Sequence, residues 1–403
     1  MRGQAARLRT RAESDPGLDV ADVARALAAP TVAFKHRAVV LGAGRAELLA
    51  GVRAVADEAS AANVISGVAD PVDRLVFVFP GQGTQWVGMA IELMDSAPVF
   101  AESIEAIEQA FARYVDWSVS DVLRGVASAP PLDRVDVVQP VLFAMMVSLA
   151  RLWESFGVRP AAVVGHSQGE IAAAHVAGAL SLDDAARIVA LRSKALGAIR
   201  GRGAMLTVLA PNDQVQELLP RWAGKLSVAA VNGPAAITVS GDSDALTEFE
   251  AALRAAKMLR WRIPGVDFAA HSAHIEDIRD ELFDLAAGIS PEPSEVAFYS
   301  AVSGKQTSTT ELNAMYWYRN LRQTVRFDEA ARALLADGYT TFLECSSQPV
   351  LTVGLQDTAD ATGTPVAILA TLRLEEGGLV RFHTAMAEAY VAGVPVDWKA
   401  LFA

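Results

Sequence analysis

The stretch Val163–Ile171, with the sequence VVGHSQGEI, determines how the rest of the chain is interpreted. The apolar run 161–164 before it predicts a buried strand, and the small-residue run 171–179 predicts a helix. Between them lies Gly-x-Ser-x-Gly, a pattern in which a serine occupies a tight strand-to-helix turn. Because Gly165 and Gly169 have no Cβ, the backbone can turn sharply there. We therefore predict that Ser167 is a nucleophile at a helix N-terminus, where free N–H groups favour negative charge. The pattern also occurs by chance, so a plain loop serine stays an alternative at this point.

The composition limits the classes of function. A length of 403 residues predicts two or three domains, and a net charge of −12 argues against nonspecific nucleic-acid binding. No uninterrupted apolar run of about 18 residues predicts a membrane span, and the N-terminus lacks the apolar core of a signal peptide. The single cysteine, Cys345, excludes an internal disulfide, and the six histidines show no metal-ligand spacing. We predict an acidic cytoplasmic protein without a metal site.

The first part of the chain, residues 1–70, is expected to form a small α/β module. Helical periodicity covers 18–27 with a break at Pro30, and a strand at 36–42 precedes an amphipathic helix at 46–56. The Ala/Ser/Gly-rich stretch 59–71 has the composition of a linker.

A change of pattern at residues 202–265 predicts an inserted subdomain. Strands and helices are expected there in the order β-α-β-β-α-β, which is the ferredoxin-like arrangement. The expected strands are 204–210, 226–231, 236–240 and 258–263, with helices at 212–219 and 244–257. The flanking segments 71–201 and 266–403 are expected to form one large α/β subdomain, with a buried strand at 75–79 and helices at 96–114, 138–156, 182–199 and 378–391.

A serine nucleophile needs an adjacent base, and His271 is the candidate. It lies in a loop of small residues after a strand, and it follows Ser167 in the chain, as in folds that use this turn. His166 and His274 are competitors, and a lone histidine is more often structural. No Asp or Glu stands out as the group that orients the base; a backbone carbonyl can do the same.

Two further features suit acyl transfer. The N–H groups of Gln168 and of Gln82, in the turn Pro80–Gly83, are expected to form an oxyanion hole. That turn lacks the lysine and spacing of a phosphate-binding loop. Arg192, among apolar neighbours on a predicted helix, is a candidate for gripping a carboxylate, although a surface arginine with a buried stem is the alternative.

With these residues assembled, the chain resembles the acyltransferase domain of modular type I polyketide synthases, which are kin to malonyl-CoA:ACP transacylases. The resemblance extends over nearly the whole chain. The sequence segments that show it are Phe79–Gly83, Arg134–Pro140, Gly165–Glu170, Val231–Pro234, Tyr316–Leu321 and Pro349–Leu351.

The resemblance implies an α/β-hydrolase-like large subdomain and a ping-pong reaction. Ser167, activated by His271, would attack an acyl-CoA and then pass the acyl group to the phosphopantetheine thiol of an acyl carrier protein. By position, the main-chain carbonyl of Asn320 would orient His271, and Arg192 would bind the free carboxylate of a malonyl-type extender. No permanently bound cofactor is implied.

The same resemblance places the chain in a multifunctional enzyme of antibiotic biosynthesis. Residues 1–70 resemble the linker from a neighbouring ketosynthase domain. The chain ends shortly after 396–398, before most of the linker that follows such domains, so we expect an excised domain.

Selectivity is expected to depend on Gln139, Gln168 and the segment Phe268-Ala269-Ala270 before His271. Malonyl-specific relatives usually carry His-Ala-Phe-His there and methylmalonyl relatives Tyr-Ala-Ser-His; this chain has neither. Its more apolar, roomier wall favours a 2-substituted malonyl unit, methylmalonyl or a larger alkylmalonyl. The alternatives are a starter-unit loading acyltransferase, a serine thioesterase or hydrolase of similar fold, and a catalytically inactive docking domain.

Overall fold

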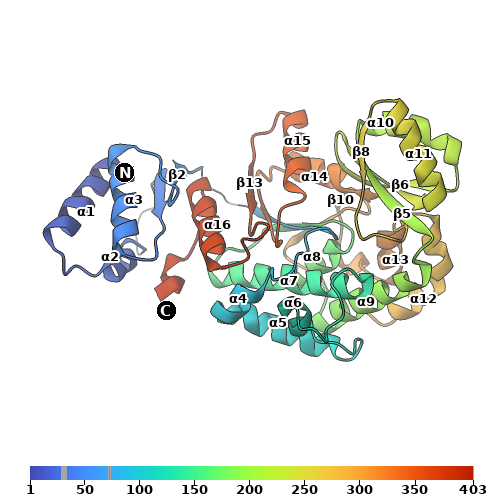
Figure 1. The fold of residues 1–403 in the computed structure, drawn as a ribbon, viewed down its shortest axis with the longest axis horizontal. Coiled ribbons are helices and arrows are strands. Elements are labelled where there is room, and N and C mark those ends of the chain that lie inside the picture. The colour runs from blue at the N-terminus through green and yellow to red at the C-terminus, as the bar shows by residue number, and fades with distance from the viewer. Residues whose placement is uncertain (29–33, 71, 73, 403) are drawn as a thin grey trace.

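The computed structural model describes residues 1–28, 34–70, 72 and 74–402. Figure 1 shows three parts along the long axis of the molecule: an N-terminal module (blue), a large central part, and a small part at the far end (yellow-green). Each part has its own sheet. The predicted break at Pro30 and the end of the predicted linker at Pro71 lie outside the described residues.

The large part is built on a six-stranded sheet in the order β10-β9-β4-β3-β12-β13. All neighbouring strands are parallel except β10, which is antiparallel to β9. The two central strands are buried on both faces, as expected for a parallel sheet covered by helices. The strands are β3 (Leu75–Phe79), β4 (Ala162–Gly165), β9 (Ala297–Ser300), β10 (Lys305–Gln306), β12 (Thr341–Glu344) and β13 (Ala367–Ala370).

Alternate side chains of this sheet enter two different cores. Phe77 and Phe79 pack in the larger core with helices on one face, whereas Val76 and Val78 face α14 and α15 on the other. The helices of this part are α4 (Ile91–Ser96), α5 (Pro98–Phe111), α6 (Val119–Arg124), α7 (Val135–Ser155), α8 (Gly169–Val176), α9 (Leu182–Leu196), α12 (Arg279–Leu285), α13 (Ala314–Arg322), α14 (Phe327–Ala336), α15 (Thr352–Thr362) and α16 (Leu379–Ala392).

Helix α7 is apolar on all sides. Within the described residues it is the one helix whose length and hydropathy would suffice to cross a membrane. It is instead the central helix of the larger core, with 89% of its most apolar window buried. A helix that is hydrophobic all round is buried in this way when its neighbours are other helices.

The small part has the expected ferredoxin-like order. Its strands β5 (Gly203–Leu209), β6 (Leu226–Gly233), β7 (Ala236–Asp242) and β8 (Leu259–Arg262) lie in the order β6-β7-β5-β8 and pair antiparallel. Helices α10 (Asn212–Leu218) and α11 (Ser243–Ala255) cover one face. The predicted fold class, a mixed α/β protein with an inserted ferredoxin-like unit, is confirmed.

One strand of the small sheet comes from outside the predicted range 202–265. Strand β11 (Val325–Arg326) pairs in parallel with β6, at Val325↔Ala230 and Arg326↔Val231. Thr324 Oγ1 also donates to the carbonyl of Val228 at 2.7 Å. The large part therefore contributes an edge strand to the small one, which no local pattern of residues 202–265 reveals.

The N-terminal module contains α1 (Arg2–Ser14), α2 (Val20–Leu27), β1 (His36–Val40), α3 (Arg45–Asp57) and β2 (Val64–Val68). The prediction of a linker at 59–71 is wrong for its middle, because β2 lies there and pairs antiparallel with β1. Small residues favour a linker by composition, but the alternating exposure of Val64–Val68 is that of a half-buried strand.

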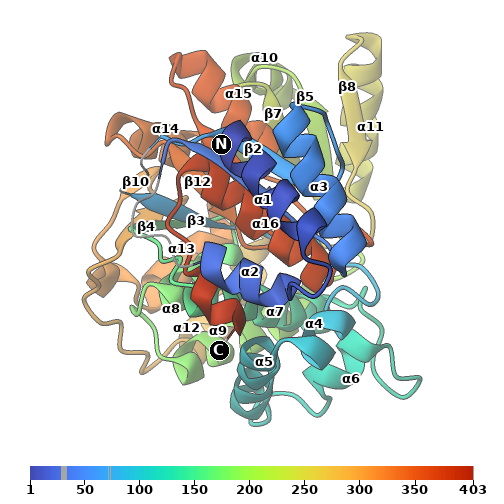
Figure 2. The same ribbon diagram turned by 90° about the vertical axis from the view of Figure 1, so that its left-hand side faces the viewer.

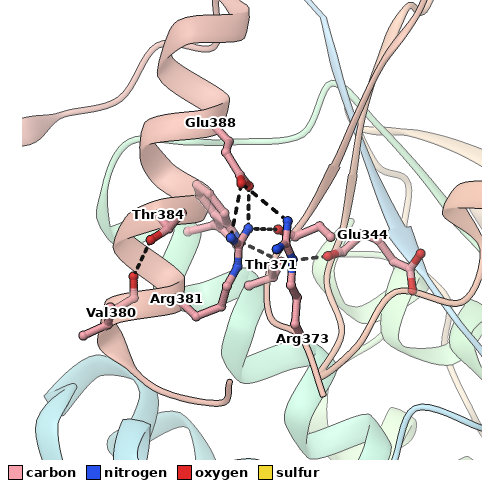
Figure 3. Close-up of polar contacts among 9 residues, drawn as sticks. Glu344, Thr371, Arg373, Val380, Arg381, Thr384 and Glu388 are labelled. Atoms are coloured by element: carbon pink, nitrogen blue, oxygen red, sulfur yellow. Dashed lines mark hydrogen bonds and ion pairs between the residues drawn. The ribbon is translucent and has the colours of Figure 1, made fainter. Parts of the chain in front are cut away.

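Helix α16 joins this module to the large part, since it packs against β1 and β2 on one side and the larger core on the other. Figure 1 shows α16 between the two parts, and Figure 2 gives the view from the side of the module. Arg37 donates to the carbonyl of Tyr390 at 2.7 Å. Figure 3 shows polar contacts on the other side of α16, where the buried guanidinium of Arg381 donates to both carboxylate oxygens of Glu388 within the helix. Two contacts tie α16 to the preceding segment: Arg373 approaches Glu388 at 3.7 Å, and Arg381 donates to the carbonyl of Ala370 on β13 at 3.4 Å.

Glu344, at the end of β12, is fully buried and organises the loop that follows. Figure 3 shows its backbone carbonyl, which accepts from Thr371 Oγ1 at 2.7 Å. The Glu344 carboxylate accepts from the N–H groups of Val350 and Leu351 at 2.9 and 3.0 Å, and from Ser346 Oγ. Burial raises the pKa of Glu344 to about 7, against the lowering effect of these hydrogen bonds.

We predict that Glu344→Gln changes how stability depends on pH. Because the pKa of Glu344 is raised in the folded state, ionisation of its carboxyl group opposes folding. The stability that the protonated group contributes is therefore fully present below about pH 4.5 and is lost as pH rises through about 7. Urea unfolding between pH 5 and 8 is the measurement. The stability of the variant relative to wild type should rise with pH. Glu102→Gln, on the exposed side of α5, is the control, and an equal trend in both variants would contradict the prediction.

Candidate active site

The strand-turn-helix at Ser167 forms as predicted, and its two glycines are needed for steric reasons. A Cβ on Gly165 would lie 2.2 Å from the backbone nitrogen of Glu170, and one on Gly169 would lie 2.1 Å from the carbonyl oxygen of Phe79. Ser167 itself has a φ of 53°, in the left-handed region that a side chain rarely adopts. This turn presents the Ser167 side chain at the N-terminus of α8.

His271 lies directly against Ser167. Ser167 Oγ and His271 Nε2 are 2.9 Å apart, and His271 Nδ1 is 2.8 Å from the carbonyl oxygen of Gln323. Because a carbonyl only accepts, Nδ1 carries the proton, and Nε2 accepts from the serine hydroxyl. The backbone N–H of His271 also donates to the carbonyl of Leu321 at 2.9 Å, so the end of α13 holds the histidine at two points.

The prediction that the carbonyl of Asn320 orients His271 is wrong. The carbonyl in contact with Nδ1 is that of Gln323, which follows the end of α13, where carbonyls have no partner within the helix. Asn320 contributes its side chain to the site instead, through Oδ1 and Nδ2.

Burial is the main cause of a low pKa for His271. Loss of water, with the positive charge of Arg192, lowers the pKa to about 3, although the bond to Gln323 acts in the opposite direction. The imidazole is therefore neutral at physiological pH, the form that can accept a proton.

Arg192 is buried at the same place, with a side chain that points to the serine. It lies on α9 and is 3% exposed. Its Nη1 donates to Asn320 Oδ1 at 2.5 Å and its Nη2 to Ser167 Oγ at 3.2 Å. Its Nε is buried and, among the described residues, has no hydrogen-bond partner. Burial lowers the pKa of Arg192 to about 10, so the group stays charged beside the nucleophile. The surface-arginine alternative is excluded by this burial.

Asn320 is also linked to a buried carboxylate that the sequence reasoning missed. Its Nδ2 donates to the Ser167 carbonyl at 3.1 Å and to Glu170 Oε2 at 2.6 Å. Glu170 is fully buried, and burial raises its pKa to about 7, partly offset by Tyr316, Ala301, Asn320 and Arg192. A signal was present: Glu170 is the one acidic residue in the otherwise small and apolar start of α8, a position where charge is rarely buried without partners.

The competing histidines are bonded elsewhere. His166 Nε2 lies 2.7 Å from Asn232 Oδ1 on β6, and His274 Nε2 lies 2.6 Å from Asp242 Oδ1 at the end of β7. Each makes a contact to the small part and neither contacts Ser167. Groups of three or more His, Cys, Asp or Glu side chains able to hold a metal ion do not occur in the described part of the chain.

Gln82 and Gln168 follow two neighbouring parallel strands, β3 and β4. Gln168 precedes α8 directly, and the loop after β3 approaches the turn at Ser167, since a Cβ on Gly81 would lie 3.1 Å from His166 Nδ1. In the region that the structure describes, neither the Gln168 nor the Gln82 N–H donates to another group. Both donors are thus available for a developing negative charge.

The residues predicted to set selectivity are buried. Gln168 is 3% exposed, and both atoms of its side-chain amide have no partner among the described residues; the same holds for Gln139 Oε1 on α7. Phe268, Ala269 and Ala270 are buried in the segment before His271. Buried amides without partners are rare in proteins, so a ligand is a natural partner for them.

Comparison with known proteins identifies the family. The acyl transferase domain family matches residues 76–396. The chain is 55% identical over 404 residues to the spectinabilin polyketide synthase system protein NorA of Streptomyces orinoci, covering 100% of this chain and 21% of NorA. It spans between 5% and 21% of the length of the curated relatives it matches.

Two solved structures are similar. The acyltransferase domain from module 8 of the salinomycin polyketide synthase has a TM-score of 0.95 and 52% identity, covering 99% of this chain and 94% of that one. A loading acyltransferase from the avermectin modular polyketide synthase has a TM-score of 0.76 and 50% identity, covering 78% of this chain and 99% of that one.

Gly169→Ala should disrupt the turn at Ser167 and with it the fold. The added Cβ meets backbone atoms of Phe79, the last residue of β3 in the central sheet, and of Pro80 directly after it, and such backbone atoms cannot move aside. We expect a loss of about 3 kcal/mol or more in the free energy of unfolding, measured with urea. Gly197→Ala is the matched control, because nothing lies within 4 Å of its Cβ and its φ is −57°. It should be neutral or slightly stabilising. Equal stability of the two variants would mean that the space at Gly169 is not limiting.

Proposed function

Because this chain belongs to the acyl transferase domain family, in the form found in modular polyketide synthases, we propose that Ser167 carries a malonyl-type extender unit from CoA to an acyl carrier protein. Membership of the family makes the chain an acyltransferase. The observation that supports the proposed mechanism is a series of hydrogen bonds from the Gln323 carbonyl through the His271 imidazole to the Ser167 hydroxyl. The charged Arg192 guanidinium donates to the same hydroxyl. Nucleophile, base and anion-binding group thus converge on one atom.

In the proposed first half-reaction, Ser167 Oγ attacks the thioester carbon as His271 Nε2 takes the hydroxyl proton. The N–H groups of Gln168 and Gln82 stabilise the negative charge that forms on the carbonyl oxygen. When the carbon–sulfur bond breaks, the CoA sulfur leaves and takes the proton from Nε2. The result is an ester on Ser167 and free CoA thiol.

The second half-reaction is the reverse with a different thiol. His271 takes the proton of the carrier protein's phosphopantetheine thiol, and the sulfur attacks the ester carbon. The carbon–oxygen bond to Ser167 then breaks, and Nε2 returns the proton to Oγ. A neutral imidazole is needed at the start of both halves, and burial of His271 maintains that form. This is a ping-pong mechanism.

Arg192 supports a malonyl-type donor. A buried guanidinium with an available Nε and an Nη2 at the serine can bind a carboxylate at two points. An acyl group without a carboxylate would leave the buried Nε of that guanidinium without a hydrogen-bond partner, which is costly. We therefore propose that Arg192 binds the free carboxylate of the extender unit.

The side chain at C2 of the extender is proposed to be methyl or a larger alkyl group. Phe268, Ala269 and Ala270 bring no side-chain hydroxyl to the segment before His271, and two of them are small. The buried amides of Gln168 and Gln139 add polar groups without partners in the described structure. Differences of one methylene in such a pocket change selectivity by only about 1–3 kcal/mol, so a related range of alkylmalonyl groups is expected.

We propose residues 1–70 as the linker to a neighbouring ketosynthase domain, 71–201 and 266–403 as the large subdomain, and 202–265 as the small one. The domain would work in the cytoplasm without a permanently bound cofactor. A starter-loading acyltransferase is the second candidate, because one similar structure is a loading acyltransferase.

Intact-protein mass after brief incubation with malonyl-, methylmalonyl-, ethylmalonyl- and isobutyryl-CoA tests the function. We expect adducts from substituted malonyl groups, lost in Ser167→Ala and retained in Ser155→Ala, an exposed serine at the end of α7. A main adduct from isobutyryl-CoA would instead support starter loading. Rapid release of free acid, without transfer to a carrier thiol, would support a hydrolase.

The rate of acylation should be nearly independent of pH on the acidic side. A base with a pKa of about 3 stays neutral at pH 5, whereas one of ordinary pKa would be only about 3% neutral there. Single-turnover acylation at saturating methylmalonyl-CoA, from pH 5 to 7.5, measures this. We expect a change of less than about threefold. A fall of about thirtyfold towards pH 5 would mean that His271 titrates as an ordinary histidine.

A further inference from the structure

Glu170 lies one turn behind the nucleophile, buried on every side, and plays no part in the proton transfers described above. Its Oε1 accepts from the backbone N–H of Ala301 at 2.5 Å. Its Oε2 accepts from Tyr316 Oη at 2.9 Å and from Asn320 Nδ2 at 2.6 Å. Tyr316 and Asn320 are four residues apart, on one face of α13, which lets both reach the same carboxylate. A buried carboxylate is retained at a cost in stability, so a role for its charge is worth seeking.

The contacts of Asn320 show what the carboxylate does. An amide side chain has one donating and one accepting end, and the two ends are similar in shape. In Asn320 the donating Nδ2 faces two acceptors, Glu170 Oε2 and the Ser167 carbonyl, while Oδ1 faces Arg192 Nη1. The carboxylate therefore selects one of the two amide orientations, the one that offers an acceptor to the arginine.

The orientation of Asn320 in turn sets that of Arg192. The guanidinium is planar, so a bond at Nη1 restricts where Nη2 and Nε point. Within the described structure, Nη1 bonds to Asn320, Nη2 to Ser167 Oγ, and Nε has no partner. If the amide turned over, its NH2 group would face the cation, and the guanidinium would lose this anchor.

We propose that Glu170 is a positioning residue for the extender carboxylate: through the Asn320 amide, it holds the guanidinium of Arg192 in the orientation that binds the carboxylate beside Ser167. This inference rests on the proposed function of Arg192. It assigns Glu170 a part in substrate discrimination, not in proton transfer.

Glu170→Gln separates this role from a purely electrostatic one. The N–H of Ala301 is a fixed donor, so the oxygen of the introduced amide would remain on it, and the NH2 group of that amide would face Asn320. That arrangement favours the wrong orientation of the Asn320 side chain. The charge effect alone acts in the opposite direction, because removal of a negative charge near Arg192 makes the site more attractive to a carboxylate.

The experiment compares methylmalonyl-CoA with propionyl-CoA, two donors that differ only by the carboxylate. The ratio of kcat/KM for the two, measured in competition, does not depend on the fraction of folded protein. In Glu170→Gln we expect the ratio to fall about tenfold or more, through a higher KM for methylmalonyl-CoA, with propionyl transfer within about threefold of wild type. Tyr316→Phe is the matched control: it removes another hydrogen bond to the same carboxylate but leaves Asn320 in place, and it should keep the ratio within about threefold.

Arg192→Gln distinguishes failure of this inference from failure of the proposed function. If Arg192→Gln lowers the ratio and Glu170→Gln leaves it unchanged or raises it, the positioning role is overturned and the proposed function stands. An equal fall in Tyr316→Phe and Glu170→Gln would also overturn it, since the effect would then not depend on the Asn320 contact. If Arg192→Gln leaves the ratio unchanged, the carboxylate-binding role of Arg192 is overturned, and the inference with it.

Discussion

The close approach of helix α8 to the end of strand β3 is the contact on which the rest of the site depends. The carbonyl of Phe79 occupies the space that a side chain at Gly169 would need, and the backbone of Glu170 does the same at Gly165. This approach forces Ser167 into a left-handed backbone conformation, at the N-terminus of α8. It also brings the loop after β3 beside the serine, so the two candidate oxyanion donors come from neighbouring parallel strands.

His271, the proposed base, is held where the large part meets the small part. His271 lies on the segment that returns from the small part, and its Nδ1 partner, Gln323, lies just before β11, which joins the small sheet. The backbone N–H of Arg326 also donates to the carbonyl of Ala301, whose own N–H binds Glu170. The position of the small part thus affects the orientation of the imidazole, although that part supplies neither the serine nor the histidine.

Buried charge is concentrated where the chain has to be held in one arrangement. Arg192 and Glu170 lie within one network around Ser167, and Glu344 organises the loop after β12. In each case burial acts against the charged form, and hydrogen bonds or an opposite charge act for it. Such groups contribute little net stability, but replacement of one partner leaves the other unsatisfied, so they specify geometry.

The sequence by itself determined the features that depend on local spacing. The strand-turn-helix at Ser167 follows from two glycines between an apolar run and a helix, and the order of elements in 202–265 follows from alternating periodicities. The candidates Ser167, His271 and Arg192 could be named because nucleophile, base and anion-binding group are distinct residue types, and the structure brings their side chains together.

Only the tertiary structure decided which distant groups meet. The carbonyl that binds His271 belongs to Gln323 and not to Asn320, because of where α13 ends relative to the segment that carries His271. Since every residue has a backbone carbonyl, the residue type gives no indication of which one is used. Strand β2 does not follow from the Ala/Ser/Gly-rich composition around it, because it is stabilised by pairing with β1 and by packing on α16, which lies near the other end of the chain. The role of Glu170 likewise requires α8, α9 and α13 to meet, since a carboxylate acquires its partners, and so its function, from the fold around it.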